Sequence, residues 1–161
     1  MQIKYLGGQK FEVKAKEAVI ILDEILTVDG FALAGPGEYE KNNAIINGIS
    51  DNGNTIYAIR TEDINLGYLG RINHVLTEDE AKQIGDVDIL FLPLGENGSA
   101  DLKTALKNLS GVDPKVVIPM LYKDLTEFKK SEGLTDGEME IFKIRKADLP
   151  EEERKIIILK A

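Results

Sequence analysis

The chain has 161 residues, of which 43% are apolar and 30% charged, a balance typical of a globular protein rather than of a disordered one. It contains no cysteine, which excludes disulfide bonds, thiolate zinc sites and cysteine nucleophiles. Its net charge of −8 opposes non-specific binding to a phosphate backbone, so we expect no nucleic-acid partner.

The length and the apolar runs indicate how the chain is organised. A chain of this size is most simply one domain, so we expect a single domain over residues 1–161. The N-terminal stretch alternates like a strand and lacks the apolar region of a signal peptide. Wholly aliphatic runs such as Val19–Leu22 are four residues long, whereas a membrane helix needs about 20. We therefore expect a cytoplasmic protein with no membrane partner.

The first half of the chain predicts a succession of strands. Short β-rich runs between turn residues predict strands at Ile3–Leu6, Lys10–Lys14, Ala18–Leu22, Ala44–Ile49, Thr55–Arg60 and Ile64–Leu69. Gly35-Pro36-Gly37 predicts a turn, because proline fixes φ at the second position and glycine accepts a positive φ at the third. Asp51-Asn52-Gly53-Asn54 predicts a tight hairpin turn between two of these strands.

The second half alternates between helices and strands. Thr77–Ile84 begins with the T-x-x-E spacing of a capping box and predicts a helix. A second helix is expected at Ala100–Leu109 with Ser99 as its N-cap, and a short third one at Asp124–Lys130. Apolar runs predict strands at Val87–Leu92, at Val116–Ile118 before Pro119, at Met139–Ile144 and at Lys155–Leu159. This order predicts packed sheets with helices outside them.

Few residue types are present that could hold a catalytic metal. His74 is the only histidine, whereas a zinc site usually contains imidazole or thiolate ligands. Carboxylates alone would favour Mg²⁺, Ca²⁺ or Mn²⁺. The stretch from Asp51 to Asn54 offers oxygen donors but lacks the glutamate that closes a calcium loop. We therefore interpret it as a hairpin turn.

Known hydrolytic and phosphate-binding motifs are also missing from the sequence. A Ser-His-Asp arrangement would have to use His74, and no G-x-S-x-G nucleophile elbow is present. The loop Gly95–Ser99 lacks the lysine of a P-loop and carries Glu96, which repels phosphate. These motifs therefore favour neither a serine hydrolase nor a nucleotide-binding protein.

The stretch YLGRINH, Tyr68–His74, contains two candidate functional residues. Arg71 follows a predicted strand end, where its guanidinium could bind a carboxylate or phosphate with two hydrogen bonds. The alternative is a surface arginine paired with a neighbouring acid. His74 lies just before the helix cap, a position more typical of a partly exposed loop residue than of a ligand.

Several motifs occur together in a specific order over almost the whole chain. They are LGGQKF from Leu6, GPGEYE from Gly35, NTIY from Asn54, YLGRINHVLT from Tyr68, GDVDIL from Gly85, the segment Pro114–Tyr122 and DLPEEE from Asp148. In these motifs the chain resembles the small bacterial branch of the metallo-β-lactamase-fold hydrolases, which is similar to the ascorbate-phosphate lactonases. The resemblance implies an α/β (α+β) fold, a truncated αββα sandwich of two packed mixed sheets with outer helices.

The resemblance also implies that the metal ligands of the family are missing. The H-x-H-x-D-H loop that supplies most of them would follow Asp23-Glu24, but the chain passes directly to Phe31 and the GPGEYE turn. Arg71 corresponds to the bridging aspartate, Leu121 to the last histidine and Gly8 to the early histidine. The segment between Gly48 and Asn54, where a further histidine often lies, is shortened, and His74 matches a histidine outside the usual ligand set.

On this basis we expect a catalytically inactive member of the family with a binding or assembly role, with no catalytic residue, metal or cofactor. The expected remnant of the site consists of Gly8, Asp23, Arg71, His74 and Leu121. Its partner would be a protein or a small anionic ligand, and self-association is a further expectation. The alternative is a divergent hydrolase with a metal-independent or carboxylate-only site, in which Arg71 holds an anionic substrate and Asp23 or His74 acts as acid or base.

Overall fold

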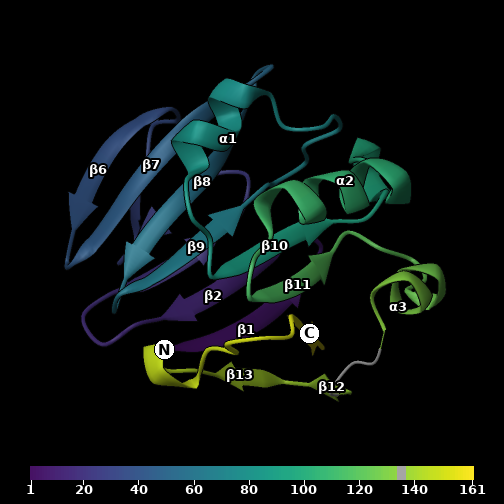
Figure 1. Ribbon diagram of the computed structural model, residues 1–161. Coiled ribbons are helices and arrows are strands. Elements are labelled where there is room, and N and C mark those ends of the chain that lie inside the picture. Colours follow the sequence, from purple (N-terminus) through teal and green to yellow (C-terminus); the bar gives the residue numbers. More distant parts are fainter. Residues whose placement is uncertain (134–136) are drawn as a thin grey trace.

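Two β-sheets packed face to face form the body of the protein in a computed structural model that describes residues 1–133 and 137–161 (Figure 1). The first sheet has the order β13-β1-β2-β3-β4-β5, and its neighbouring strands run antiparallel. Its strands are β1 (Gln2–Gly7), β2 (Lys10–Lys14), β3 (Val19–Leu22), β4 (Thr27–Val28), β5 (Phe31–Ala32) and β13 (Ile141–Lys143).

The second sheet is mixed and has the order β14-β11-β10-β9-β8-β7-β6. The pairs from β14 to β9 are parallel, and the pairs from β9 to β6 are antiparallel. Its strands are β6 (Gly37–Lys41), β7 (Ala44–Asp51), β8 (Asn54–Thr61), β9 (Ile64–Tyr68), β10 (Ile89–Pro93), β11 (Val116–Met120) and β14 (Lys155–Ile156). A short parallel pair, β12 (Glu138–Met139) with β15 (Ile158–Leu159), lies beside them.

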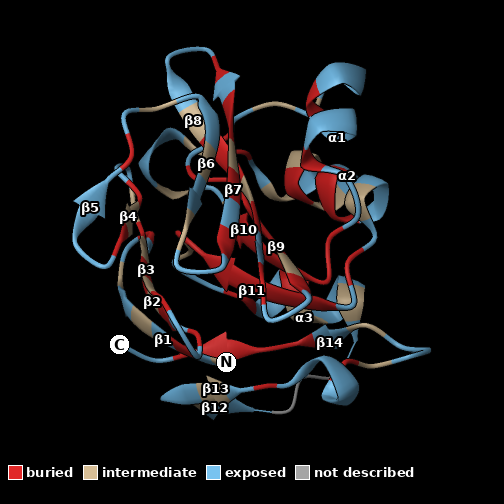
Figure 2. Ribbon diagram, turned by 90° about the vertical axis from the view of Figure 1, so that its left-hand side faces the viewer, coloured by how far each residue is buried: buried red, intermediate tan, exposed pale blue. Residues whose placement is uncertain are grey.

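The α-helices of the described residues pack on the outer face of the second sheet (Figures 1 and 2). They are α1 (Glu78–Ile84), α2 (Leu102–Val112) and α3 (Thr126–Glu132), accompanied by the 3₁₀ turns η1 (Glu96–Gly98) and η2 (Lys146–Asp148). The expected sandwich of two sheets with outer helices is therefore confirmed. None of the described helices is long and apolar enough to cross a membrane.

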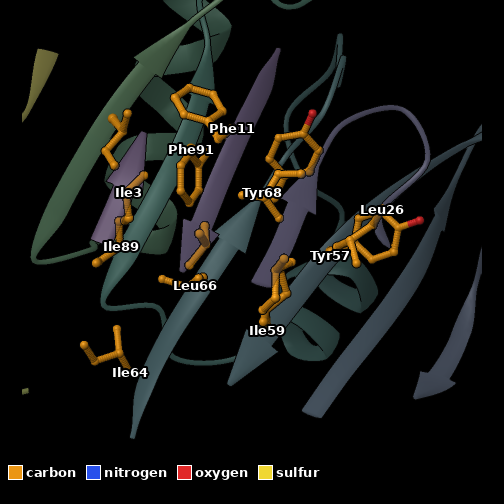
Figure 3. Packing of buried hydrophobic residues seen from close by; sticks show 14 of the residues in the cluster. Ile3, Phe11, Leu26, Tyr57, Ile59, Ile64, Leu66, Tyr68, Ile89 and Phe91 are labelled. Carbon is orange, nitrogen blue, oxygen red and sulfur yellow. The ribbon is translucent and has the colours of Figure 1, made fainter. Parts of the chain in front are cut away.

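The main core lies between the two sheets, because alternate residues of the strands point inward. In β2, Phe11 and Val13 are fully buried while Lys10 and Lys14 are exposed, as the period of a half-buried strand requires. Figure 3 shows how aromatic rings from both sheets meet in this core: Phe11 lies 4.8 Å from Phe91 between ring centroids, in an edge-on arrangement. A second core fills the space between the second sheet and the helices.

The predicted hairpin turn is confirmed and joins β7 to β8. Asp51 is paired with Asn54 at the end of the ladder, and both central residues have a positive φ, 44° at Asn52 and 89° at Gly53. This conformation is that of a type I′ turn, whose twist matches the flanking strands.

Four local predictions are wrong. The strands expected at Met139–Ile144 and at Lys155–Leu159 are each divided, into β12 and β13 and into β14 and β15. The N-cap of α2 is Asp101, whose carboxylate accepts a hydrogen bond from the backbone N–H of Thr104, whereas the Ser99 hydroxyl accepts one from the N–H of Gly95. Pro119 does not end its strand, since β11 continues to Met120. The proline is tolerated because β14 pairs only with Val116 and Val117 of β11. At Pro119 that side of β11 is a sheet edge, where the missing N–H of proline costs no ladder hydrogen bond.

Candidate functional site

A small polar pocket lies where the β1–β2 turn, the end of β3 and the ends of β8 and β9 meet. Its volume is about 90 Å³, and residues around it include Gln9, Asp23, Glu24, Asn54, Tyr68 and Arg71. Each polar side chain lies at the end of a strand or next to one whose apolar residues are in the core, so the sheets fix the positions from which these side chains project. We call this site the Arg71 pocket.

A chain of hydrogen bonds crosses the Arg71 pocket from one sheet to the other. Arg71 Nε donates to Gln9 Oε1 at 3.0 Å, and Gln9 Nε2 donates to Asp23 Oδ1 at 3.2 Å. Below them, the buried hydroxyl of Tyr68 donates to the backbone carbonyl of Gln9 at 3.0 Å. Burial strongly raises the pKa of Tyr68, and the nearby charge of Asp23 raises it further, so this hydroxyl keeps its proton.

The charges in the Arg71 pocket are balanced. Arg71 Nη2 lies 3.9 Å from Glu24 Oε2, and Lys10 Nζ lies 3.8 Å from Asp23 Oδ2. Asp23 Oδ1 accepts from the backbone N–H of Glu24 at 2.8 Å as well as from Gln9. Two cationic side chains therefore lie beside the two carboxylates of the pocket.

These residues do not fit a divalent metal ion. Zinc in proteins takes several ligands from imidazole, thiolate and carboxylate groups, and among the described residues lining this pocket only Asp23 and Glu24 belong to those types. Both oxygens of Asp23 already face N–H or ammonium groups. The fixed positive charge of Arg71 would also repel a dication at close range.

The structure brings together only part of the predicted remnant. Asp23 and Arg71 line the same pocket. Gly8 is next to Gln9 in the β1–β2 turn, where its carbonyl accepts from the hydroxyl of Tyr5. Leu121, at the end of β11, is 98% buried in the core between the sheets, as only 2% of its surface is exposed.

The backbone at Leu121 has an unusual conformation. Its φ of 52° lies in the left-handed region, which costs a residue with a side chain about 1–2 kcal/mol. The segment is fixed by the N–H of Glu96, which donates to the Leu121 carbonyl at 2.9 Å. Sequence patterns gave no sign of this conformation, because leucine rarely adopts it.

A second polar cluster surrounds His74, away from the Arg71 pocket. His74 Nε2 lies 3.2 Å from Glu80 Oε2 and 3.5 Å from Asp51 Oδ1. Asp51 ends β7, His74 lies in the loop after β9, and Glu80 is in the first turn of α1. The ligand atoms of the three side chains lie within 4.8 Å of one another, which makes them a possible metal-binding group.

The pKa values of the two carboxylates of this cluster shift in opposite directions. Burial raises the pKa of Asp51, although the nearby His74 acts in the opposite direction. Burial also acts to raise the pKa of Glu80, but hydrogen bonds from the Thr77 backbone and from His74 outweigh it, so the pKa is lowered.

Asp51 and Glu80 were predicted only as a turn residue and a capping-box residue. Both roles are confirmed, and their convergence on His74 had no signal in the local spacing.

Residues 8–121 match the model of the beta-lactamase superfamily domain, and the chain therefore belongs to this superfamily. Over its full length it is similar to a candidate zinc-dependent hydrolase of the metallo-β-lactamase superfamily from Thermotoga maritima, with a TM-score of 0.85, 23% identity and complete coverage of both chains. A metallo hydrolase from Ignicoccus hospitalis aligns with a TM-score of 0.62 and 15% identity over 81% of this chain and 89% of that one. These identities establish the fold alone.

A curated relative shares a short segment. This protein, from Carboxydothermus hydrogenoformans, is described as a UPF0173 metal-dependent hydrolase and is 52% identical over 40 residues. The matched segment spans 25% of this chain and 18% of the relative. The match over residues 8–121 confirms the expected superfamily, and the expected loss of the family's metal ligands stays a prediction.

Proposed function

We propose that the Arg71 pocket recognises a small anionic ligand without a metal ion. The observation that carries this proposal is the hydrogen bond from Arg71 Nε to Gln9 Oε1, which holds the guanidinium at the pocket. Nη2 lies 3.9 Å from Glu24, beyond hydrogen-bond distance, so this edge of the guanidinium is able to donate to a ligand. A volume of about 90 Å³ suits a carboxylate or phosphate group.

The chemistry of the pocket supports binding without turnover. Metal sites promote hydrolysis through a water of lowered pKa and a Lewis acid, and the residues of this pocket do not suit the metal ion that would supply them. Asp23 is held by hydrogen bonds from Gln9 and from the backbone, which stabilise it as an acceptor. The function that this geometry supports best is therefore that of a catalytically inactive binding protein on a hydrolase fold.

A titration of the protein with inorganic phosphate and with acetate, followed by NMR, tests the recognition. Saturable shifts of the Arg71 Nε–H signal are expected. Arg71→Ala should weaken binding about 10- to 100-fold, because a hydrogen bond to a charged group contributes about 1.5–3 kcal/mol. Arg145→Ala is the matched control, since Arg145 is exposed and paired with Asp148. Equal binding by Arg71→Ala, or no saturable binding, would refute the proposal.

The second candidate function is a divergent hydrolase. Superfamily membership and the descriptions of the relatives as metal-dependent hydrolases favour it more than they favour an inactive protein. Such an enzyme would use Arg71 to hold an anionic substrate with Asp23 as acid or base, or would take a metal at Asp51, His74 and Glu80. Lactonase and phosphodiesterase assays with added Zn²⁺ and Mn²⁺ separate the candidates. Turnover that Arg71→Ala or His74→Gln abolishes would establish the hydrolase.

A further inference from the structure

The cluster of Asp51, His74 and Glu80 contains a buried oxygen that has no hydrogen-bond partner. The side chain of Asp51 is only 3% exposed, and its Oδ1 accepts no hydrogen bond. His74 Nε2 lies 3.5 Å from this oxygen, but the contact does not meet hydrogen-bond geometry. An unpaired buried carboxylate oxygen is costly, so a hydrogen-bond donor or a cation at this point would stabilise the cluster.

A single N–H at His74 Nε2 cannot donate to both carboxylates of the cluster. The N–H at Nε2 can point at Glu80, whose Oε2 is 3.2 Å away, but it then leaves Asp51 Oδ1 without a donor. A metal ion in the space between the three groups could contact all of them at once. The side chain of Glu80 is 11% exposed and that of His74 is 28% exposed, so the space is largely screened from water.

The distances in the cluster suit a metal of the size of zinc. Zinc binds nitrogen and carboxylate oxygen at about 2.0–2.2 Å, so ligand atoms around a tetrahedral ion are separated by about 3.3–3.5 Å. The separations from His74 Nε2 to Glu80 Oε2 and to Asp51 Oδ1 are 3.2 and 3.5 Å. The donor set of one imidazole and two carboxylates is also one that divalent transition metals accept.

The surroundings of His74 present the correct nitrogen to such an ion. Nδ1 lies 3.4 Å from Asn73 Oδ1, an acceptor, so the ring has a partner for its proton on Nδ1 when Nε2 binds an ion. The lone pair of Nε2 then faces the two carboxylates. The carbonyl of His74 accepts from Asn108 Nδ2 at 3.0 Å, which anchors the loop to α2. Supporting contacts of this kind orient metal-ligating histidines in proteins.

We propose that Asp51, His74 and Glu80 form a site for one divalent transition metal ion, with Zn²⁺ as the expected occupant. This site lies outside the Arg71 pocket and does not depend on the function proposed for that pocket. The ion would join the end of β7 to the loop after β9 and to the first turn of α1, which follows that loop directly in the sequence. Its chemical effect is to neutralise two buried carboxylates and to fix the hairpin turn against the helix.

The test is a titration of chelator-treated full-length protein with Zn²⁺ in competition with a chromophoric chelator. One equivalent is expected to bind. His74→Gln and Asp51→Asn should each weaken the affinity at least about 100-fold, because even the loss of a supporting contact around a metal costs about 10–100-fold. At a hundredfold excess over Kd, Zn²⁺ should raise the Tm of the parent by about 5 °C or more.

Glu80→Gln is the most informative variant. Glutamine preserves the capping box with Thr77, so α1 should fold while the ligand charge is lost. Glu78→Gln, the same change at an exposed position of the same helix, is the matched control and should bind Zn²⁺ like the parent. The NMR signals of His74 give a second readout, because Zn²⁺ should fix the neutral form with its proton on Nδ1.

Three outcomes would overturn the site. The first is binding of less than one equivalent of Zn²⁺, and the second is parent-like affinity in folded Glu80→Gln and His74→Gln. The third is loss of Zn²⁺ binding in Arg71→Ala while His74→Gln still binds Zn²⁺. The last result would place the ion in the Arg71 pocket and would contradict both proposals. A failure of phosphate binding with intact Zn²⁺ binding would affect the Arg71 pocket alone.

Discussion

At the scale of single residues, the chemistry depends on side chains that meet only after folding. Asp51 and Glu80 have clear local roles in the sequence, one in a hairpin turn and one in a capping box. Each role was predictable because it depends on neighbours within a few positions. Their contact with His74 depends on how α1 packs against the second sheet. No spacing in the sequence encodes that packing.

The buried hydroxyl of Tyr68 leads to a prediction at this scale. Tyr68→Phe should lower the free energy of unfolding by about 1–2 kcal/mol, because the Gln9 carbonyl would be left buried without a donor. Urea denaturation of the variant and the parent measures the difference. Tyr5→Phe is a matched control, since the Tyr5 hydroxyl donates to Gly8 at the same 3.0 Å distance but in an exposed setting. An equal loss in both variants would contradict the role assigned to burial.

At the scale of elements, strands and caps were predicted better than their exact ends. The hairpin of β7 and β8 and the capping box of α1 are as expected, because turn and cap residues specify them locally. The N-cap of α2 was misplaced because Ser99 and Asp101 are both good caps and the η1 turn uses Ser99. Pro119 was predicted to end its strand because proline cannot donate a hydrogen bond within a sheet. Its position at a sheet edge depends on the order of the strands, which the local sequence does not specify.

Asp88, beside the first residue of β10, links several elements and gives a pH-dependent prediction. Its carboxylate accepts from the N–H of Asn65 at 2.9 Å and from Lys146 at 2.9 Å, and it lies 3.2 Å from Lys115. Burial acts to raise its pKa, but these donors outweigh burial and lower it. A lowered pKa in the folded state gives stability that is present above the unfolded value and lost as the pH falls through the folded value.

Asp88→Asn should therefore reduce the free energy of unfolding at pH 7 by about 1.5–3 kcal/mol, the range for hydrogen bonds to a charged group. The difference from the parent should shrink as the pH falls below about 4, because the parent then loses the same charge. Denaturant titrations at several pH values measure this trend. Asp86→Asn, at an exposed position nearby, should behave like the parent. A pH-independent difference would rule out the charge as its cause.

At the scale of the whole molecule, the order of motifs predicted the fold better than any single element did. The short strands β4, β5, β12 and β14 have two residues each, so their pairing cannot be predicted from local pattern. Motifs distributed from Leu6 to Asp148 nevertheless identified the superfamily, and the match over residues 8–121 agrees. The expected single domain over residues 1–161 and the expected self-association stay predictions.

The second sheet takes part in both cores, so the protein should unfold as one cooperative unit. Four of the five tyrosines, Tyr5, Tyr39, Tyr57 and Tyr68, pack in or against the core between the sheets, and the helices report on the outer core. Tyrosine fluorescence and far-UV circular dichroism should therefore give coincident transitions in urea, as for a two-state domain. Two separated transitions would contradict both this expectation and the single-domain prediction.

The left-handed backbone at Leu121 has a consequence for how this fold could change. The resemblance aligns Leu121 with a metal-ligating histidine of the family, and the buried leucine keeps a backbone conformation from which it gains nothing. Asparagine or glycine would adopt the same path with less strain. A change of Leu121 to either residue would therefore exchange buried apolar surface for a relaxed main chain, and the balance of the two decides the sign of its effect on stability.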